Sequence, residues 1–367
     1  MNKLLFIVFA AFSAACSDTT PLPADPQATP ETRALYRNLF RIADEGVMFG
    51  HQDDALYGHD WKYEEGRSDV RECCGDYPAV FGWELGGLET GADRSIDDVP
   101  FAEITRLLCA AYGRGAVNTV SWHPQNPESG ASAWDGKTST AVSSILPGGA
   151  NHAQFRLWLD RLAGFFVGLK SADGTCAPVL FRPFHEHTGS GFWWGEAQCT
   201  PDEYKALWRF TVEYLRDVKG VHNLLYVYSP DLYRNAEHYT ERYPGDEWVG
   251  VLGLDAYHRP QDWDFLSGGE RMLSTLQRLG REHGKPTAFT ETGLEGIPDT
   301  AWWTRRLLPV IRGKGLSYVL VWRNAHDRPT HFFGPWHGHA SEPDFRKFAA
   351  NREQPVLFES QLPDMYH

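Results

Sequence analysis

Val179-Leu-Phe-Arg-Pro-Phe-His-Glu186 and Pro286-Thr-Ala-Phe-Thr-Glu291 are the two stretches that decide the fold. Each is an apolar run of strand length that ends in a glutamate. Burying a carboxylate at the end of an apolar strand costs free energy unless the group is paired or solvated. In a (β/α)₈ barrel, the carboxyl ends of the strands form the face that carries the active site. The two stretches therefore predict barrel strands, with both glutamates at one face.

Six further apolar runs of strand length share this pattern, and segments of helix length lie between them. The eight expected strands are residues 47–50, 79–83, 117–122, 178–184, 223–228, 248–254, 287–290 and 317–322. Several are nearly continuous in Val, Leu, Ile and Phe, which is typical of parallel strands buried on both faces. The alternation of strands and helices predicts an α/β protein.

The helical segments and the loops complete the fold prediction. The expected helices are residues 32–43, 100–112, 151–169, 200–218, 271–283 and 300–311. Thr200-Pro-Asp-Glu203 has the form of a helix start, with a capping Thr, Pro at the first position and Glu at the third. Segments 52–76, 122–150 and 228–245 are expected to be cleft-forming loops. We therefore predict a single (β/α)₈ TIM barrel over residues 31–367, with elaborated loops at the C-terminal face of the strands.

The first residues have the pattern of a targeting segment. Lys3 precedes an apolar run, residues 4–12, that is too short to span a membrane. Ser13-Ala-Ala-Cys16 then resembles a bacterial lipoprotein cleavage site, although such sites usually have Leu where Ser13 stands. We expect a signal peptide over residues 1–15, a lipid on Cys16, and a Pro-rich tether over residues 16–30. An ordinary cleavable signal peptide is the alternative.

Charge and composition restrict the partners. The formal net charge of −13 argues against nucleic acid and anionic membrane surfaces, and it suits a neutral substrate. The chain has 14 Trp residues, whose flat faces can stack on sugar rings. We expect a monomer whose only membrane contact is the lipid on Cys16. We expect the anchored protein on the periplasmic side of the bacterial cell envelope, because no run of acidic residues follows Cys16.

The remaining cysteines are Cys73, Cys74, Cys109, Cys176 and Cys199. They are too few for a disulfide scaffold, and their spacing fits no zinc ribbon. Two alternatives are open in an exported protein. One is a bridge between Cys176 and Cys199, which flank the fourth expected strand, and the other is a set of buried free thiols.

Polar or titratable residues follow every expected strand. They are His51, Asp53, Asp54, Glu84, Trp122, His123, His185, Glu186, Ser229, Asp231, Asp255, Tyr257, Glu291, Trp322 and Arg323. So complete a set would be unusual in a purely structural barrel. Cleaving a glycosidic bond requires one carboxylic acid to protonate the leaving oxygen and a second carboxylate to attack the anomeric carbon or activate water. Glu186 and Glu291 are the candidates, whereas Glu84 is expected to be structural or to bind sugar.

Longer motifs make the assignment more specific. Phe181-Arg-Pro-Phe-His-Glu-His-Thr-Gly-Ser-Gly-Phe-Trp-Trp-Gly195 resembles the acid/base motif of glycoside hydrolase family 26, the family of many β-mannanases. Phe289-Thr-Glu-Thr-Gly293 resembles the nucleophile motif of that family. Three further strand tips are similar to the first, third and eighth of the family: Phe49-Gly-His-Gln-Asp-Asp54, Ser121-Trp-His-Pro-Gln-Asn-Pro127 and Val321-Trp-Arg-Asn324.

The resemblance implies a retaining hydrolase that needs neither a metal nor another cofactor. It implies that Glu186 is the acid/base and Glu291 the nucleophile, and that His185 and Tyr257 hydrogen-bond the nucleophile. It further implies that four strand-tip residues bind sugar in addition to His185 and Tyr257: Trp122, His123, Trp322 and Arg323. Trp193, close to the departure from the family at Gly191, is also expected to bind sugar. An apolar surrounding of Phe184, Phe192 and Trp193 is expected to raise the pKa of Glu186.

One departure leaves the substrate less defined. Many family mannanases have a Trp where this chain has Gly191, and that Trp stacks on the sugar beyond the cleavage point. The resemblance favours an endo-acting β-1,4-mannanase that acts on mannan, galactomannan and manno-oligosaccharides. Alternatives within the family are an exo-type enzyme that releases mannobiose, a lichenase and a β-1,3-xylanase.

Two alternatives belong to other classes of protein. His185 and His187, with His51, His123 and Asp255, could form a metal site, but metal-dependent barrel hydrolases usually have His-x-His on the first strand, and here that strand ends in His51-Gln-Asp. A sugar-binding lipoprotein without catalysis is the other alternative. The presence of both glutamates together with His185 and Tyr257 argues against it.

Overall fold

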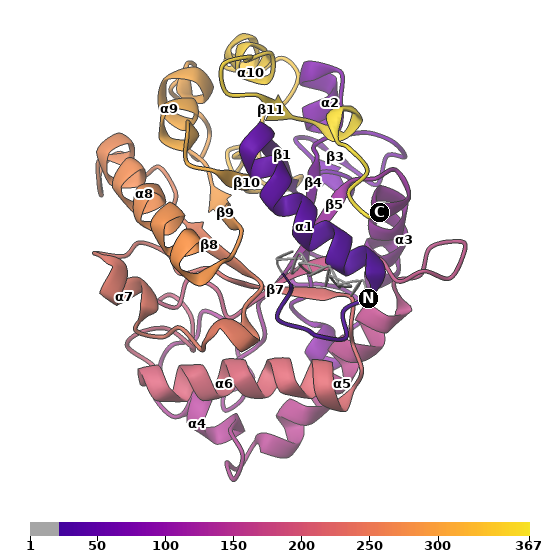
Figure 1. Ribbon diagram of the computed structural model, residues 1–367, viewed down its shortest axis with the longest axis vertical. Helices are drawn as coiled ribbons and strands as arrows, with labels where there is room; N and C mark the ends of the chain where they lie inside the picture. The colour runs from indigo at the N-terminus through magenta and orange to yellow at the C-terminus, as the bar shows by residue number, and fades with distance from the viewer. Residues whose placement is uncertain (1–21) are drawn as a thin grey trace, which may run out of the picture.

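A computed structural model describes residues 22–367 as a closed parallel barrel with helices around it (Figure 1). The strands follow one another around the barrel in chain order, and pairing of the last with the first closes it. They are β1 (Val47–Gln52), β4 (Val80–Glu84), β5 (Val117–Trp122), β6 (Val179–Pro183), β7 (Leu224–Tyr228), β8 (Val251–Asp255), β9 (Thr287–Thr292) and β10 (Leu316–Val321). Every residue in these strands is buried, as predicted from their continuous apolar character. The predicted (β/α)₈ barrel is confirmed.

Six helices coincide with the predicted helical segments, in whole or in part. They are α1 (Pro30–Glu45), α3 (Phe101–Gly113), α5 (His152–Gly168), α6 (Pro201–Glu213), α8 (Phe265–His283) and the short α9 (Leu308–Ile311). The start of α6 is the predicted capping box, in which Thr200 and Glu203 exchange hydrogen bonds with each other's backbone N–H. A π-turn, η2 (Tyr214–Val218), continues α6, and another, η4 (Trp303–Leu307), precedes α9. Pro309 in α9 lacks an N–H, which accounts for the irregular hydrogen bonding before it.

Several short elements were not predicted. They are the hairpin strands β2 (Tyr57–Gly58) and β3 (Trp61–Lys62), the helices α2 (Asp69–Cys74), α4 (Ala141–Ile145), α7 (Ala236–Thr240) and α10 (Glu342–Ala349), strand β11 (Val356–Leu357), and the turns η1 (Leu88–Thr90), η3 (Asp246–Trp248) and η5 (Glu359–Gln361). The expected strand at 248–254 begins three residues later because η3 occupies its start. Helix α8 begins six residues before its predicted start, because its paired glycines Gly268 and Gly269 are buried against Trp263 and Val310.

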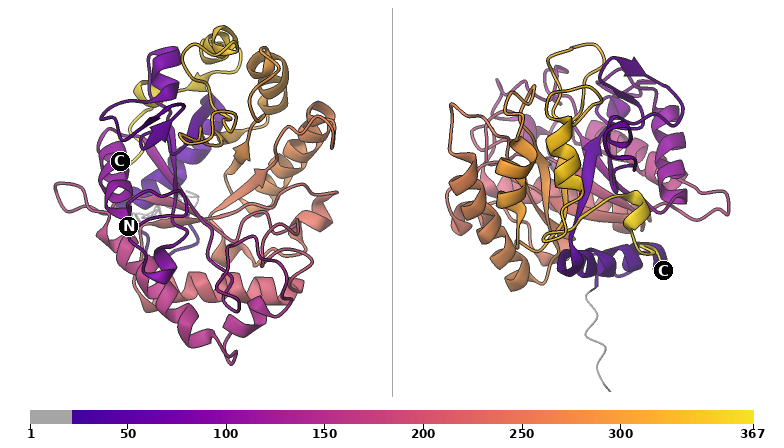
Figure 2. Two further views of the ribbon diagram at one scale, coloured as in Figure 1. Left: turned by 180° about the vertical axis from the view of Figure 1, so that it is seen from behind. Right: turned by 90° about the horizontal axis from the view of Figure 1, so that it is seen from above.

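The two ends of the barrel differ in their contents. Helix α1 lies across the amino ends of the strands, and the long loops lie at the opposite end (Figure 2). Leu35, Leu39 and Ile42 of α1 pack with residues such as Met48 and Leu320 inside the barrel. This apolar contact closes the amino end of the barrel and leaves the carboxyl end to the polar residues.

The segment before α1 packs against the barrel instead of hanging free. The carboxylate of Asp25, which is 2% exposed, bonds Nδ1 of His222 at 2.8 Å, and Thr29 N–H donates to the His222 carbonyl. The predicted tether over residues 16–30 is therefore too long at its carboxyl end. Its remainder, with Cys16 and the predicted signal peptide, lies outside the described residues. None of the helices within residues 22–367 is long and apolar enough to cross a membrane.

The proposed bridge between Cys176 and Cys199 is wrong. All five cysteines within residues 22–367 are free thiols. Cys176 precedes β6, whereas Cys199 lies in the loop that follows it, where Arg242 Nη1 donates to its sulfur at 3.3 Å. A strand of five residues spans about 16 Å. The two thiols therefore sit at opposite ends of the barrel, far beyond the reach of a disulfide.

Candidate active site

Residues at and after the carboxyl ends of β5, β6, β8, β9 and β10 surround one cleft at the carboxyl end of the barrel. The cleft has a volume of about 350 Å³. Its lining residues are His123, Trp134, His185, Glu186, Phe192, Tyr257, His258, Arg259, Glu291, Glu295, Trp322, His331 and Phe333. The structure thus brings Glu186 and Glu291 together, with His123, His185, Tyr257 and Trp322 from the predicted set.

A local irregularity in β9 directs Glu291 into the cleft. The strand pairs Phe289 with Leu254 and Glu291 with Asp255, so one extra residue lies in β9 between the two pairs. Such a bulge breaks the alternation of side chains between the two faces of a strand. Phe289 packs outward in the core between the barrel and its helices. The extra residue, Thr290, donates its hydroxyl to the carboxylate of Asp255 at 2.5 Å, and Glu291 next to it faces the cleft.

Glu291 is held on both of its oxygens. Tyr257 donates its hydroxyl to Oε2 at 2.6 Å, and Arg182 Nη2 donates to Oε1. Glu291 is 3% exposed. Charge-assisted hydrogen bonds of this kind stabilise the ionised form of a carboxylate and fix its direction. Arg182 is a buried residue of β6 that sequence reasoning did not single out.

Asp255 completes the surroundings of Arg182. Its Oδ2 accepts from Arg182 Nη1 at 2.7 Å and from Ser229 Oγ at 3.1 Å. One buried guanidinium is therefore shared by two carboxylates, Asp255 and Glu291, and the group of three carries a net negative charge when both are ionised. A buried cation requires such partners. Asp255 consequently positions Arg182 and does not face the cleft.

Glu186 stands in a different environment. It is half-buried, and within residues 22–367 no side chain hydrogen-bonds its carboxylate. Burial raises the pKa of Glu186 well above its usual range, and the negative charges of Glu291 and Asp255 add to the shift. The predicted direction is confirmed. Unlike the predicted cause, which was apolar packing alone, the observed causes include the neighbouring carboxylates.

The backbone that carries Glu186 is strained. Phe184 and Glu186 have φ angles of 47° and 54°, in the left-handed region that residues with a side chain rarely adopt. Hydrogen bonds hold this conformation: Tyr204 donates its hydroxyl to the Phe184 carbonyl at 2.9 Å, and Trp194 Nε1 donates to the His185 carbonyl at 2.7 Å. Strain of this kind persists only where the surroundings determine it strongly. It is found here at the candidate acid.

A chain of polar contacts links His185 to Glu84. The pKa of His123 is raised, because the carboxylate of Glu84 lies 2.7 Å from its Nδ1 and outweighs the opposite effect of burial. Burial together with the positive charges of Arg182 and His123 holds the pKa of His185 well below its usual range. Nε2 of His123 lies 3.0 Å from Nε2 of His185. The two rings are therefore joined by a hydrogen bond, and Glu84 holds the far side of His123.

This arrangement corrects one predicted role. His185 was expected to hydrogen-bond the nucleophile, but its Nε2 lies 4.0 Å from Oε1 of Glu291 and hydrogen-bonds Nε2 of His123 instead. Glu84 is structural: its carboxylate accepts from Ser121 Oγ at 2.6 Å, from His123 and from the Gly86 N–H, and the residue is 1% exposed.

Two predicted sugar-binding tryptophans do not reach the cleft. Trp122 is fully buried, and its indole N–H donates to Glu89 at 3.1 Å. Side chains alternate along β5, so Trp122 shares the outward face with Val120, whereas His123 points inward. Trp193 is also fully buried, and its N–H donates to the Pro124 carbonyl at 2.9 Å. Both residues support the site from behind.

The eighth strand tip places one predicted residue in the cleft and one beside it. Trp322 is half-buried and lines the cleft. Arg323 is absent from the lining, because its guanidinium pairs with Asp97 at 2.8 Å and with the Tyr57 hydroxyl at 3.1 Å.

The cleft also contains residues that sequence reasoning missed. Trp134 is 54% exposed although it is a tryptophan, and its ring is stacked near His123 with 5.2 Å between centroids. Its position in a polar loop, Ser132-Ala-Trp-Asp-Gly136, was the available signal. The loop after β10 brings His331 into the cleft, where its Nδ1 lies 2.7 Å from Oε1 of Glu295.

The substitution of Gly for the expected Trp at position 191 leaves open space. A Cβ atom built on Gly191 would meet no atom within 4 Å. Phe192 beside it lines the cleft and stacks on Trp194 with 4.6 Å between ring centroids. The aromatic surface on this side of the cleft is thus supplied by Phe192 and Trp134.

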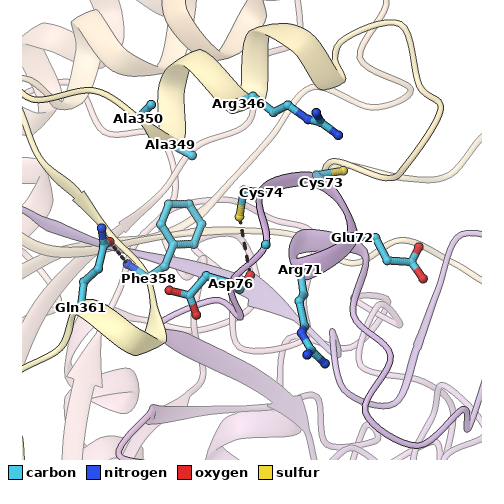
Figure 3. A pocket seen from close by; sticks show the side chains of 11 residues that line it. Arg71, Glu72, Cys73, Cys74, Asp76, Arg346, Ala349, Ala350, Phe358 and Gln361 are labelled. Atoms are coloured by element: carbon cyan, nitrogen blue, oxygen red, sulfur yellow. Dashed lines mark hydrogen bonds between the residues drawn. The ribbon is translucent and has the colours of Figure 1, made fainter.

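A larger hollow of about 580 Å³ lies away from this site, between α2 and α10 (Figure 3). It is lined by Cys73, Cys74 and charged side chains whose groups have partners: Arg346 bonds Glu342, and Arg71 bonds the Tyr77 hydroxyl at 2.9 Å. Neither catalytic candidate is near it, so its size alone does not indicate function.

The arrangement of the histidines does not match the metal alternative. Across residues 22–367, no group of three or more His, Cys, Asp or Glu side chains is arranged to hold a metal ion. His187 points away from His185 into the protein, where its Nε2 lies 2.9 Å from the Tyr228 hydroxyl and its Nδ1 lies 3.0 Å from that of Tyr204.

Comparison with known proteins gives concordant results. The model of glycosyl hydrolase family 26 matches residues 24–268. A solved β-mannanase of this family from Bacteroides ovatus shares 45% identity with a TM-score of 0.89, over 92% of this chain and 98% of that one. A mannan endo-1,4-β-mannosidase of Bifidobacterium adolescentis is 35% identical over 352 residues, covering 89% of this chain and 34% of that protein. One from Bacillus subtilis is 31% identical over 76% of this chain and 75% of its own length.

The chain thus spans about a third of the length of the Bifidobacterium protein. The family match ends at residue 268, before Glu291, whereas the alignments with the solved structure cover nearly all of the barrel.

Proposed function

This chain belongs to glycosyl hydrolase family 26, and from that membership and the geometry of its cleft we propose that it is a retaining endo-β-1,4-mannanase. One observation carries the proposal: two carboxylates share one cleft but have opposite surroundings. Glu291 is saturated with hydrogen-bond donors, whereas Glu186 has none and a raised pKa. Two carboxyl groups whose environments differ in this way can supply the nucleophile and the acid that glycoside cleavage requires.

The proposed reaction is a double displacement. The ionised Oε of Glu291 attacks the anomeric carbon of the sugar while Glu186, still protonated, gives its proton to the leaving oxygen. The bond between the sugar and the leaving group breaks, and a glycosyl ester on Glu291 forms. Glu186, now ionised, then takes a proton from water, which attacks the same carbon and releases Glu291.

The electrostatics of the cleft suit this exchange of roles. The negative charge of Glu291 is one of the causes that raise the pKa of Glu186. Esterification of Glu291 removes that charge, so the pKa of Glu186 falls when the residue must act as a base. Tyr257 and Arg182, which bond Glu291 before the attack, are free to stabilise the departing carboxylate in the second step.

The first test is product release from linear β-1,4-mannan and from short manno-oligosaccharides, followed over time by chromatography. A ladder of mixed lengths is expected from an endo-acting enzyme, and mannobiose alone from the earliest time points would indicate the exo-acting alternative. The stereochemistry of the first product, read by proton NMR, is expected to be the retained β-anomer. No release from mannan, with activity on mixed-linkage glucan or β-1,3-xylan, would reassign the substrate.

We also propose that a lipid on Cys16 anchors the enzyme in the bacterial cell envelope, with the periplasmic side favoured, and that the enzyme acts as a monomer without nucleic-acid partners. The signal-like sequence before Cys16 supports the anchor. Helix α1 lies at the amino end of the barrel (Figure 2), whereas the cleft residues lie at the carboxyl end, so an anchor ahead of α1 is compatible with a cleft that faces away from the membrane. Labelling with a fatty-acid analogue in the native protein but not in Cys16→Ser, with cell fractionation, tests this anchor. Label in both would contradict it.

A further inference from the structure

A second hollow, of about 240 Å³, adjoins the cleft and shares two of its walls, His123 and Trp134. Only two loops line it, one after β4 and one after β5. The lining residues are Gly87, Glu89, Thr90, Ile96, His123, Gln125, Gly130, Ala131, Ser132, Ala133 and Trp134. The hollow, called the side pocket below, therefore adjoins the cleft on the flank formed by the loops after β4 and β5.

The lining of the side pocket is suited to a sugar ring. Trp134 and Ile96 are 54% and 46% exposed, which is unusual for such large apolar side chains. Aromatic and aliphatic surfaces of this kind pack against the C–H face of a pyranose. Within residues 22–367, the side chains of Gln125 and Ser132 donate no hydrogen bond to the protein. Apolar walls with a few free polar groups are typical of small-molecule sites.

The walls of the side pocket are built rigidly. The carboxylate of Glu89 is 1% exposed and accepts from the backbone N–H groups of Gly87 and Gln125 at 2.9 Å each, and from the Trp122 indole at 3.1 Å. This buried group ties the two loops together. Trp122, which was expected to bind sugar, thus contributes by holding the wall of the side pocket in place.

We propose that the side pocket receives an α-galactosyl branch of the mannan chain while the main chain occupies the cleft. The inference rests on the proposed mannanase function and specifies its substrate. A galactosyl branch is a single neutral ring that projects sideways from the main chain. The volume of the side pocket lies below the range of about 300–1,000 Å³ typical of drug-sized sites and suits one ring. Trp134 and His123 line both hollows, so a ring in the side pocket would lie next to the cleft that holds the main chain.

The test blocks the side pocket and leaves the cleft unchanged. Ala131 is exposed, lines the side pocket and has a backbone that accommodates any L-residue, so Ala131→Trp fills the space without strain. The substrates are a galactomannan and the same polymer after its branches have been removed with α-galactosidase. We expect kcat/KM on the branched polymer to fall by about tenfold or more in the variant, and on the debranched polymer to stay within about twofold.

Two further variants show whether an effect of Ala131→Trp comes from filling the side pocket. Ala172→Trp places the same side chain on an exposed turn at the other end of the barrel and should change neither rate. Gln125→Ala removes a free amide without adding bulk, and it should lower the rate on the branched polymer alone. An equal loss on both polymers, or no loss on either, would overturn the proposal. Failure of the native enzyme to cleave even the debranched polymer would instead remove the mannanase function on which the inference rests.

Discussion

Glu291 and Glu186 occupy the same cleft, yet the protein treats them in opposite ways. Glu291 ends a strand, and a tyrosine and an arginine bind both of its oxygens. Glu186 lies in a strained loop after β6, and no side chain in the described part of the protein bonds its carboxylate. The first arrangement supplies hydrogen-bond donors to a carboxylate, whereas the second favours the protonated form of a carboxyl group by raising its pKa. The comparison teaches that one cleft can give two carboxylates opposite environments, through hydrogen-bond donors on one and through burial of the other, as the two proposed roles require.

The largest expected effect comes from removing the fixed charge. Glu291→Ala should lower kcat on linear mannan by about 10⁴-fold or more, because no covalent intermediate can form. Glu295→Ala is the matched control, since Glu295 lines the same cleft but contacts His331 and neither catalytic candidate. It should lose less than about tenfold. Comparable losses in both variants, measured as initial rates, would mean that Glu291 has no special role.

Removing the proton donor should have a smaller and more selective effect. Glu186→Ala is expected to lower kcat by about 10²–10⁴-fold on mannan, which is the usual contribution of general acid–base catalysis. The loss should be much smaller in the first step with an aryl mannoside whose leaving group needs no proton. Added azide should restore turnover by replacing water as the second nucleophile. A variant that responds to neither leaving group nor azide would contradict the assignment of Glu186.

The donors around Glu291 can be weakened one at a time. Tyr257→Phe removes the hydroxyl that bonds Oε2 at 2.6 Å and leaves Arg182 in place. We expect kcat/KM to fall by about 10–100-fold, in line with the loss of one charge-assisted hydrogen bond of about 1.5–3 kcal/mol. Steady-state kinetics with unchanged near-UV circular dichroism would measure this. An unaltered rate would mean that Arg182 alone orients the carboxylate.

The position of the alkaline limb of activity tests the environment of Glu186. Asp231 is a further negative charge that raises the pKa of Glu186, and its own carboxylate accepts from Thr188 Oγ1 at 2.5 Å. Asp231→Asn keeps an acceptor for Thr188 but removes the charge. The protonated Glu186 should then be lost at lower pH, so the alkaline fall of kcat/KM should begin earlier than in the native enzyme. Asp44→Asn, on the exposed side of α1, should leave the profile unchanged.

How far the sequence predicts this site depends on the level of structure. The parallel strands, the capping box at Thr200 and both glutamates could be predicted, because they follow from local apolar runs and known motifs. It was harder to predict to which side of a barrel strand each side chain points. Alternation along β5 already placed Trp122 outward with Val120, and applying the period of two would have corrected that prediction. In contrast, the bulge at Thr290 that turns Glu291 inward breaks the same period and is not visible in the sequence.

Contacts between distant segments could not be predicted at all. Arg182 of β6 meets Asp255 of β8 and Glu291 of β9 only because the sheet closes into a barrel, since β7 separates β6 from β8. The same closure sets His185 against His123 instead of Glu291. Trp134 and His331 enter the cleft from loops whose course depends on these packed neighbours. Such pairings are separated by many residues along the chain, and local propensity carries no information about them.

The smallest expected effect concerns stability. The folded pKa of Glu186 is raised, so between its unfolded value, about 4.3, and that raised value the folded state binds more protons than the unfolded state. The free energy of unfolding therefore falls as pH rises through this range. Glu186→Gln cannot ionise, and it should melt about 1–3 °C above the native enzyme at pH 7 and at the same temperature near pH 4. Glu237→Gln, an exposed residue of α7, serves as the control in calorimetry. If Glu186→Gln were no more stable at pH 7, the cleft would not be holding a proton on Glu186 at the expense of stability, and the contrast between the two carboxylates would have to rest on hydrogen bonding to Glu291 alone.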